Sequence, residues 1–386
     1  MKVAILSPYP TFPFREEKDW VKPTFENNAT WTVQLANFLS RIPDTEVHVV
    51  TESEEITCSK ELRAGNLILH FVKSPAHFKT LTLWQFDRMR LHRVLRDIRP
   101  DIVHGQGIES QYGYATVTAP YPYVLTIHGL SMLSNKALNL PLFSRPRLVE
   151  LFERYCLHKV RNVIVINPFI TEFLKLTPPR YNLFPIPNAI GEHFFNAPPA
   201  PRESHLLLAI GYVDRLKAHD VLAQAMAQLR QRQVACRAII AGPLIASDYL
   251  TALRQYVHDQ QLDVEFPGFV PPDQLLPLLL RCTILVHPSR HDNSPVALGE
   301  AMATGAPVVA SRVGGIPNIV RDGDTGMLFE SENATELADK LQHLLENKSA
   351  RDQLAGRGRE FAVNTYHPSR VAALTRAVYQ GILSGK

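Results

Sequence analysis

Short apolar runs alternate with longer amphipathic stretches along this chain, and this alternation restricts the possible folds more than any other feature. In the first half, strands are predicted at residues 3–6, 47–50, 67–71, 101–103, 124–127 and 163–166. Helices are predicted between them, at residues 30–39, 83–99 and 147–159. Continuous apolar runs are typical of central strands in a parallel sheet. The pattern therefore predicts an α/β protein with helices on both faces of a parallel sheet.

The alternation stops once and then restarts. Residues 188–204 lack periodicity and contain Pro198, Pro199 and Pro201, which indicates a domain boundary. Later strands are predicted at 206–210, 238–241, 264–266, 283–286 and 307–310, and late helices at 335–347, 350–365 and 368–383. We predict two Rossmann-like, doubly wound domains, 1–190 and 191–367, facing each other across a cleft at their strand carboxyl ends. The helix within 368–386 is expected to pack back on the first domain.

Composition excludes several classes of protein. The formal net charge of +4 over 386 residues suits anionic ligands and does not by itself indicate nucleic acid, which we do not expect as a partner. The four cysteines are scattered without metal-ligand spacing, so we expect reduced thiols, no metal site and a cytoplasmic protein. No apolar run approaches the ~20 residues that span a bilayer.

The segment from Cys282 to Gly326 carries the clearest sequence signal. Ser294 and Pro295 predict a helix start, with Ser294 as the capping residue, and Gly305 predicts its end. Within this helix Glu300 has only small or apolar neighbours, so its carboxylate should be buried. One interpretation is a ligand site, with hydroxyls bound by Glu300 and a phosphate at the helix start. The alternative is a structural ion pair with Arg312.

Two further loops contain candidate functional residues. After the strand at 206–210, Gly211 allows close backbone approach, and Arg215 and Lys217 could bind a diphosphate, although a solvated basic loop is the more common case. In the first half, His128 ends a strand and should face the cleft, where a catalytic and a structural role are about equally expected. The stretch His104 to Gly107 gives a similar but weaker signal.

These motifs resemble those of the family 4 glycosyltransferases along nearly the whole chain. The resemblance is carried by His287-Pro288-Ser289, by Asp292 through Glu300 with the following Ala301 to Val309, and by Gly314-Gly315-Ile316-Pro317. Gly211 with Lys217 adds a further likeness in the second half, and Ile186 to Ala189 and Thr126 to Gly129 are looser likenesses in the first half. The resemblance implies the GT-B fold and transfer of a sugar from a nucleotide donor with retention at the anomeric carbon.

The resemblance also implies a role for each matching residue. Glu300 would hold the donor ribose, Asp292 would contact sugar hydroxyls, and backbone amides near Ser294 and Val296 would bind the diphosphate. Lys217, with Arg215, would neutralise the leaving group, and His128 would position the sugar. Gly211, Ser289 and Asn293 join the donor-binding set, and Asn27 and Asn28 would form a phosphate loop in the first domain. No cofactor is implied beyond a donor of the UDP or GDP type.

Several positions depart from the family pattern. The first acidic residue is Asp292 where Glu is common, Tyr212 replaces Arg, Ala218 replaces Gly, Asn318 replaces Glu, and Asn27-Asn28 replaces a diglycine. These departures leave open a GT-B nucleotide-sugar epimerase or a degenerate protein that only binds sugar nucleotides. A nicotinamide dehydrogenase is disfavoured, because Ser7-Pro8-Tyr9-Pro10 follows the first strand in place of a glycine-rich fingerprint.

The acceptor is the least defined partner. A carbohydrate, a lipid-linked sugar or a small molecule would fit, and the loops at 7–28 and 131–144 are expected to select it. Residues 79–99 carry five arginines beside apolar residues and could dock on the inner face of a membrane. An ordinary amphipathic helix with a solvated basic face is the favoured alternative.

Overall fold

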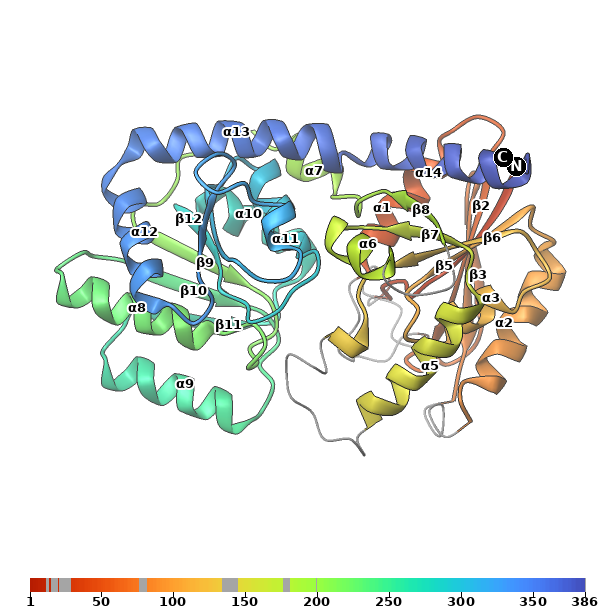
Figure 1. Ribbon diagram of the computed structural model, residues 1–386, viewed down its shortest axis with the longest axis horizontal. Helices are drawn as coiled ribbons and strands as arrows, with labels where there is room; N and C mark the ends of the chain where they lie inside the picture. The colour runs from red at the N-terminus through yellow and green to blue at the C-terminus, as the bar shows by residue number, and fades with distance from the viewer. Residues whose placement is uncertain are drawn as a thin grey trace. The chain divides into compact units, whose positions relative to one another are not determined.

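The structure is a computed structural model that describes residues 1–11, 14, 20, 29–75, 82–133, 145–175, 181–198 and 200–385. The chain divides into two compact units (Figure 1). Unit 1 contains Met1–Gly191 together with Pro368–Lys386, and unit 2 contains Glu192–His367. The change from one unit to the next falls between Gly191 and Glu192.

Unit 1 is built on an eight-stranded sheet with the order β3-β4-β2-β1-β5-β6-β7-β8. Its strands are β1 (Lys2–Leu6), β2 (Glu46–Ser53), β3 (Lys60–Ala64), β4 (Leu67–Lys73), β5 (Ile102–Gln106), β6 (Tyr123–Ile127), β7 (Asn162–Val165) and β8 (Asn182–Pro185). The edge strand β3 runs antiparallel to β4, and the other described pairs are parallel. The strand order reverses between β1 and β5.

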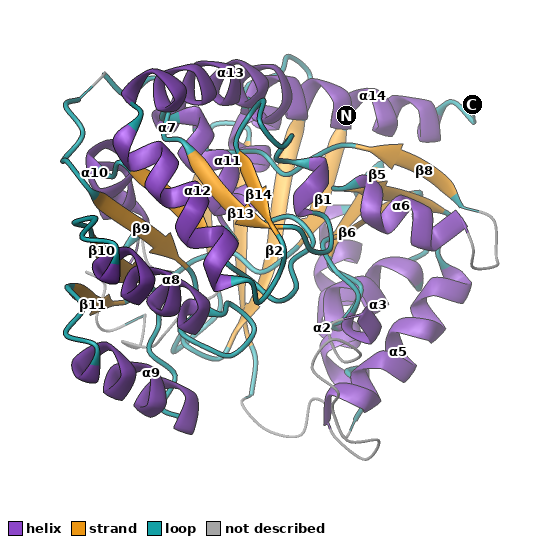
Figure 2. Ribbon diagram, turned by 60° about the vertical axis from the view of Figure 1, so that its left-hand side comes forward, coloured by secondary structure: helices purple, strands orange, loops and turns teal. Residues whose placement is uncertain are grey.

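Helices cover both faces of this sheet (Figure 2). They are α1 (Thr30–Ser40), α2 (Gln85–Ile98), α3 (Gln111–Val117), α5 (Arg145–Lys159), α6 (Pro168–Lys175) and α14 (Pro368–Leu383). Val3 and Ile5 pack with residues of α1 and α14, whereas Ala4 and Leu6 pack with residues of α2 and α3 on the opposite face. The apolar run of β1 is therefore buried on both sides, as its composition predicts.

Unit 2 is built on a six-stranded parallel sheet with the order β11-β10-β9-β12-β13-β14. Its strands are β9 (Leu206–Ile210), β10 (Arg237–Ala241), β11 (Val264–Gly268), β12 (Ile284–His287), β13 (Val308–Ser311) and β14 (Met327–Phe329). Counted within the unit, this is the Rossmann order 3-2-1-4-5-6, which reverses between β9 and β12.

The helices of unit 2 are α7 (Glu192–Phe195), α8 (His219–Gln231), α9 (Asp248–Asp259), α10 (Pro272–Arg281), α11 (Val296–Ala303), α12 (Ala334–Glu346) and α13 (Lys348–Tyr366). Side chains of α8, α9 and α12 form one core with Leu207, Ile240 and Val286 of the sheet. On α11, which packs against β12, β13 and α13, the residues from Leu298 to Ala303 are buried. The α/β class with two Rossmann-like sheets is confirmed.

Candidate functional site

Two loops of unit 2 meet where the order of its strands reverses. β9 and β12 are adjacent parallel strands, so the loops that follow them leave the same edge of the sheet. Lys217 lies in the first loop and Asp292 in the second, and the Lys217 Nζ is 2.5 Å from the Asp292 Oδ2. The structure thus joins two candidate residues that lie 75 positions apart in sequence.

Asp292 has a second buried partner, His287, which is the last residue of β12. The His287 Nε2 lies 3.0 Å from the Asp292 Oδ2. Burial alone would raise the pKa of Asp292, but the Lys217 charge and the His287 hydrogen bond hold it well below its usual range. Burial lowers the pKa of His287, so a neutral ring donates its Nε2 hydrogen to an ionised carboxylate. No role for His287 is predicted from the sequence, although its position at a strand end was an available signal.

A glycine holds the backbone of Asp292 in place. Gly314 has a φ of +52°, and a Cβ at this position would lie 2.1 Å from the Asp292 carbonyl oxygen. The same oxygen accepts a hydrogen bond from the Gly315 N–H at 2.9 Å. A side chain at position 314 would therefore displace Asp292. The turn therefore needs glycine at position 314, because its backbone passes too close to the Asp292 carbonyl oxygen for a side chain to fit.

The loop that carries Lys217 is fixed by Arg290. The Arg290 Nη2 lies 2.7 Å from the Asp220 Oδ2, and its Nη1 donates to the Arg215 carbonyl at 2.6 Å. The stem of Lys217 lies over Gly211, where a Cβ would come within 3.4 Å of the lysine Cε. The Arg215 side chain, by contrast, is exposed and contacts no described residue through a hydrogen bond or ion pair.

Helix α11 begins one residue later than its sequence predicts. Ser294 does not cap it: Pro295 occupies the capping position, with a φ of −65° and no side-chain hydrogen bond, and the helix runs from Val296 to Ala303. Proline fixes its own φ but can also precede the first helical residue in an extended conformation, as it does here. The N–H groups of Ser294 and Val296 accordingly make no hydrogen bond within the described chain. Gly305 follows the helix with a φ of +71°, as predicted for its end.

Glu300 lies on the buried face of α11 with only 7% of its surface exposed. Its carboxylate makes neither a hydrogen bond nor an ion pair with any described residue, and burial raises its pKa to about 7. The alternative of a pair with Arg312 is wrong, because Arg312 binds Asp322 and Glu330 instead. Hydroxyl donors from a ligand would satisfy this carboxylate.

Ser289 and Asn293, also expected at the donor site, are both buried. The Ser289 hydroxyl lies 3.1 Å from the His287 Nε2, and its carbonyl accepts a hydrogen bond from Ser311 at 2.6 Å. Ser289 therefore supports the loop from inside. Asn293 lies three residues before Val296, the first residue of α11.

In unit 1, His128 directly follows β6 at the carboxyl edge of the sheet. Its Nε2 lies 2.7 Å from the Gln106 Oε1 at the end of β5, and its ring centroid is 4.9 Å from that of Trp31. Burial lowers the pKa of His128 to about 4, so the imidazole is neutral at pH 7. Asn27 and Asn28 lie outside the described residues. Among those described, no three His, Cys, Asp or Glu side chains are grouped to hold a metal ion.

Two family models match consecutive parts of the chain. Residues 29–191 match the model described as Glycosyltransferase Family 4, and residues 192–361 match Glycosyl transferases group 1. A D-inositol 3-phosphate glycosyltransferase of Nocardioides sp. is 32% identical over 169 residues, which are 40% of this chain and 37% of that protein. The matched region thus spans well under half of this relative.

Solved structures extend the likeness over the full length. Sucrose-phosphate synthase from Thermosynechococcus elongatus has a TM-score of 0.81 at 18% identity, with all of both chains covered. HepE of Anabaena, solved in complex with UDP-glucose, has a TM-score of 0.72 at 15% identity, covering 98% of this chain and 100% of its own. At these identities the likeness establishes the fold.

Proposed function

The chain belongs to the family 4, or group 1, glycosyltransferases, and from this premise we propose that it transfers a sugar from a nucleoside diphosphate donor to an acceptor hydroxyl with retention of configuration. The observation that carries the proposal is the set of polar groups gathered at the carboxyl edge of the unit 2 sheet. There Lys217, Asp292, the Glu300 carboxylate and the amides at the start of α11 come from neighbouring elements, and the Glu300 carboxylate and these amides have no hydrogen-bond partner among the described residues.

Each group matches one part of a nucleotide sugar. The ribose hydroxyls can donate to the Glu300 carboxylate, which no described residue satisfies. The amides of Ser294 and Val296 and the positive end of the helix suit a diphosphate. Lys217 carries three N–H donors, so it can remain near Asp292 while it also binds a phosphate oxygen. Asp292 is left to accept from the sugar hydroxyls.

The proposed reaction needs little covalent chemistry from the protein. The acceptor oxygen forms a bond to the anomeric carbon on the face from which the diphosphate oxygen departs, and a donor phosphate oxygen takes the acceptor proton. Lys217, with Arg215, stabilises the charge that develops on the leaving diphosphate. His128, neutral at pH 7, is assigned a contact that positions the sugar.

The test is thermal stabilisation by a panel of nucleotides and nucleotide sugars, beginning with UDP-glucose because HepE was solved with it. A ligand that binds the native state raises the melting temperature. We expect one diphosphate nucleotide to stabilise the wild type and Glu265→Gln, an exposed carboxylate on β11, but not Glu300→Ala. No shift for any nucleotide at millimolar concentration would overturn the donor site.

Product analysis separates the remaining alternatives. A glycosylated acceptor identifies the transferase, and its anomeric configuration identifies retention. An epimerised donor would identify an epimerase. Binding without turnover would identify a degenerate protein, which the replacement of a common Arg by the exposed Tyr212 keeps under consideration.

We further propose that the acceptor is lipid-linked, from a surface that two helices of unit 1 share. Leu83, just before α2, and Phe86 and Met89 of α2 are 49%, 60% and 58% exposed. The residues 79–81 of the expected segment are not described. On α5, Leu148, Leu151 and Tyr155 are exposed as well. We call these six side chains the α2–α5 surface.

Contacts beneath this surface join its two halves. Trp84 and Phe152 pack with ring centroids 4.6 Å apart, and Tyr114 of α3 contacts both Phe152 and Tyr155. Arg93 and Arg96 are exposed further along α2. A solvated amphipathic helix would bury its large apolar side chains, whereas apolar groups beside arginines suit an anionic lipid surface. Within the described part of the chain, no helix has the length and apolarity to span a bilayer.

A further inference from the structure

Three buried polar side chains of unit 1, those of Tyr379, His104 and Gln106, form a continuous chain that leads from α14 to His128. The Tyr379 hydroxyl lies 2.6 Å from the His104 Nδ1. The His104 Nε2 is 3.0 Å from the Gln106 Nε2, and the Gln106 Oε1 is 2.7 Å from the His128 Nε2. The chain therefore connects the C-terminal helix with a residue assigned to the transferred sugar.

The chain lies inside the apolar core, where unmatched polar groups are costly. Tyr379, His104 and Gln106 are 0%, 1% and 4% exposed. Burial lowers the pKa of His104 to about 3, so this ring, like that of His128, is neutral at pH 7. Neutral imidazole has one donor and one acceptor nitrogen, so each hydrogen bond in the chain must have a direction.

The amide of Gln106 sets that direction. Its oxygen can only accept, so the hydrogen on the neutral His128 ring lies on Nε2. Its nitrogen can only donate, so the His104 Nε2 accepts, and the Thr126 hydroxyl also lies 2.6 Å from this nitrogen. The His104 hydrogen is then on Nδ1 and is donated to the Tyr379 hydroxyl. His128 consequently presents Nδ1 as a hydrogen-bond acceptor.

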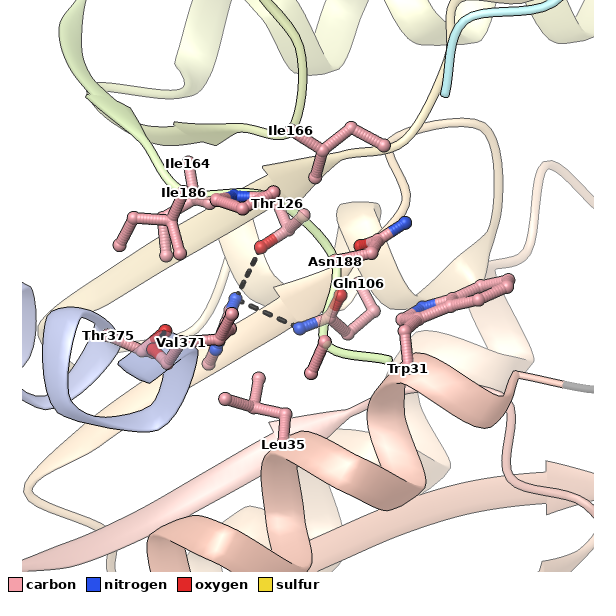
Figure 3. A pocket seen from close by; sticks show the side chains of 13 residues that line it. Trp31, Leu35, Gln106, Thr126, Ile164, Ile166, Ile186, Asn188, Val371 and Thr375 are labelled. Atoms are coloured by element: carbon pink, nitrogen blue, oxygen red, sulfur yellow. Dashed lines mark hydrogen bonds between the residues drawn. The ribbon is translucent and has the colours of Figure 1, made fainter. Parts of the chain in front are cut away.

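The surrounding core leaves this chain some room. A cavity of about 20 Å³ is bordered by His104, Gln106, Thr126, Asn188 and Thr375. Figure 3 shows Thr126 and Gln106 on one side and Val371 and Thr375 of α14 on another. Because this space borders the His104 ring, packing alone does not fix that ring. The hydrogen bonds do so.

We propose that Gln106, His104 and Tyr379 are positioning residues that hold His128 as its Nε2–H tautomer, with Nδ1 as the acceptor for a sugar hydroxyl. None of the three needs to touch the substrate. Through Tyr379, helix α14 helps to orient His128. The inference rests on the proposed function for its catalytic consequence, but the tautomer of His128 can be measured without any substrate.

The test compares Tyr379→Phe and Gln106→Leu with the matched control Tyr366→Phe, a buried tyrosine of α13 with no hydrogen bond from its hydroxyl to a described residue. Nitrogen-15 correlation spectra of the His128 ring report the tautomer. In both test variants we expect the Nε2–H form to lose its dominance, and kcat with the donor from the nucleotide panel to fall roughly 10- to 100-fold with KM little changed. Tyr366→Phe should change neither.

The outcomes separate the two proposals. An unchanged His128 tautomer in Tyr379→Phe and Gln106→Leu overturns the positioning chain, whether or not the protein turns over a donor. A changed tautomer in a protein without turnover supports the chain and removes the proposed function. A changed tautomer with wild-type kcat overturns the catalytic role of the chain while leaving the transferase intact.

Discussion

Asp292 and Glu300, two carboxyl groups of one short segment, have opposite electrostatic environments. Lys217 and His287 stabilise the ionised form of Asp292, whereas Glu300 is buried and pairs with no charged group of the described residues. Environments that move two carboxyl pKa values apart are typical of functional sites. The sequence predicted that Glu300 is buried, from its apolar neighbours. It could not predict that Lys217 contacts Asp292, because that contact depends on which strands become neighbours.

Burial of Glu300 gives a pH dependence of stability. Its pKa rises from 4.5 to about 7 in the folded protein, so the folded state keeps a proton that the unfolded state has lost. The contribution of Glu300 to the free energy of unfolding should therefore fall by roughly 3 kcal/mol between pH 4.5 and pH 8. Glu300→Gln should reduce the total fall by this amount, measured by urea unfolding at both pH values. Glu265→Gln is the control, and an unchanged pH dependence in Glu300→Gln would contradict the assignment.

Lys217 and Asp292 should be strongly coupled. Asp292→Ala leaves a partly buried ammonium without its carboxylate, and we expect a loss of roughly 3–5 kcal/mol in the free energy of unfolding at pH 7. Adding Lys217→Met removes the unpaired charge, so the double variant should be more stable than the sum of the single changes predicts. Additivity within about 0.5 kcal/mol would mean that the pair is not coupled.

At the scale of elements, long apolar strands and periodic helices were predicted well, and short elements were not. Strand β3 was not predicted because its polar residues lie on the exposed edge of the sheet, and helix α3 was not predicted because it is only seven residues long. The start of α11 was also misplaced, because either Ser294 or Pro295 could occupy the capping position and the structure places Pro295 there. The turn at Gly314 was recognised by resemblance, but its purpose is visible only in the close approach to Asp292.

Gly314→Ala tests the link between this turn and the site. Gly314 and Gly323 both have positive φ, but a Cβ at 314 would strike the Asp292 carbonyl, whereas a Cβ at 323 meets nothing within 4 Å. Gly323→Ala should therefore cost only the left-handed strain, roughly 1–2 kcal/mol. Gly314→Ala should cost more and should also abolish stabilisation by the donor nucleotide. Equal effects of the two changes on thermal unfolding and binding would contradict this role.

For the whole molecule, the restart of the strand pattern predicted two Rossmann-like sheets, and both are present. The proline-rich segment after residue 188 lies close to the change between units at Gly191 and Glu192. The class of acceptor could not be predicted from the sequence, because the sequence does not show which apolar side chains are exposed and can contact a partner. In the segment 83–99, Leu91 and Leu95 are buried while Phe86 and Met89 are exposed.

Vesicle binding tests the α2–α5 surface. The whole protein should sediment with vesicles that contain anionic phospholipid more than with neutral phosphatidylcholine vesicles, and salt should weaken the binding. Phe86→Ser with Met89→Ser should reduce it at least several-fold. Ile245→Ser, at an exposed apolar residue of unit 2, should leave it unchanged. Equal sedimentation with both kinds of vesicle would leave the surface without a lipid partner.

The position of α14 has a consequence for how the chain is made. Tyr379 is fully buried in the same core as Val3 and Leu35, although it is translated hundreds of residues after them. Unit 2 is continuous in sequence, so its core can close while the ribosome is still working. The core of unit 1 cannot be completed, and part of its apolar surface stays uncovered, until α14 has left the ribosome. The half that is synthesised first is therefore the half that finishes folding last.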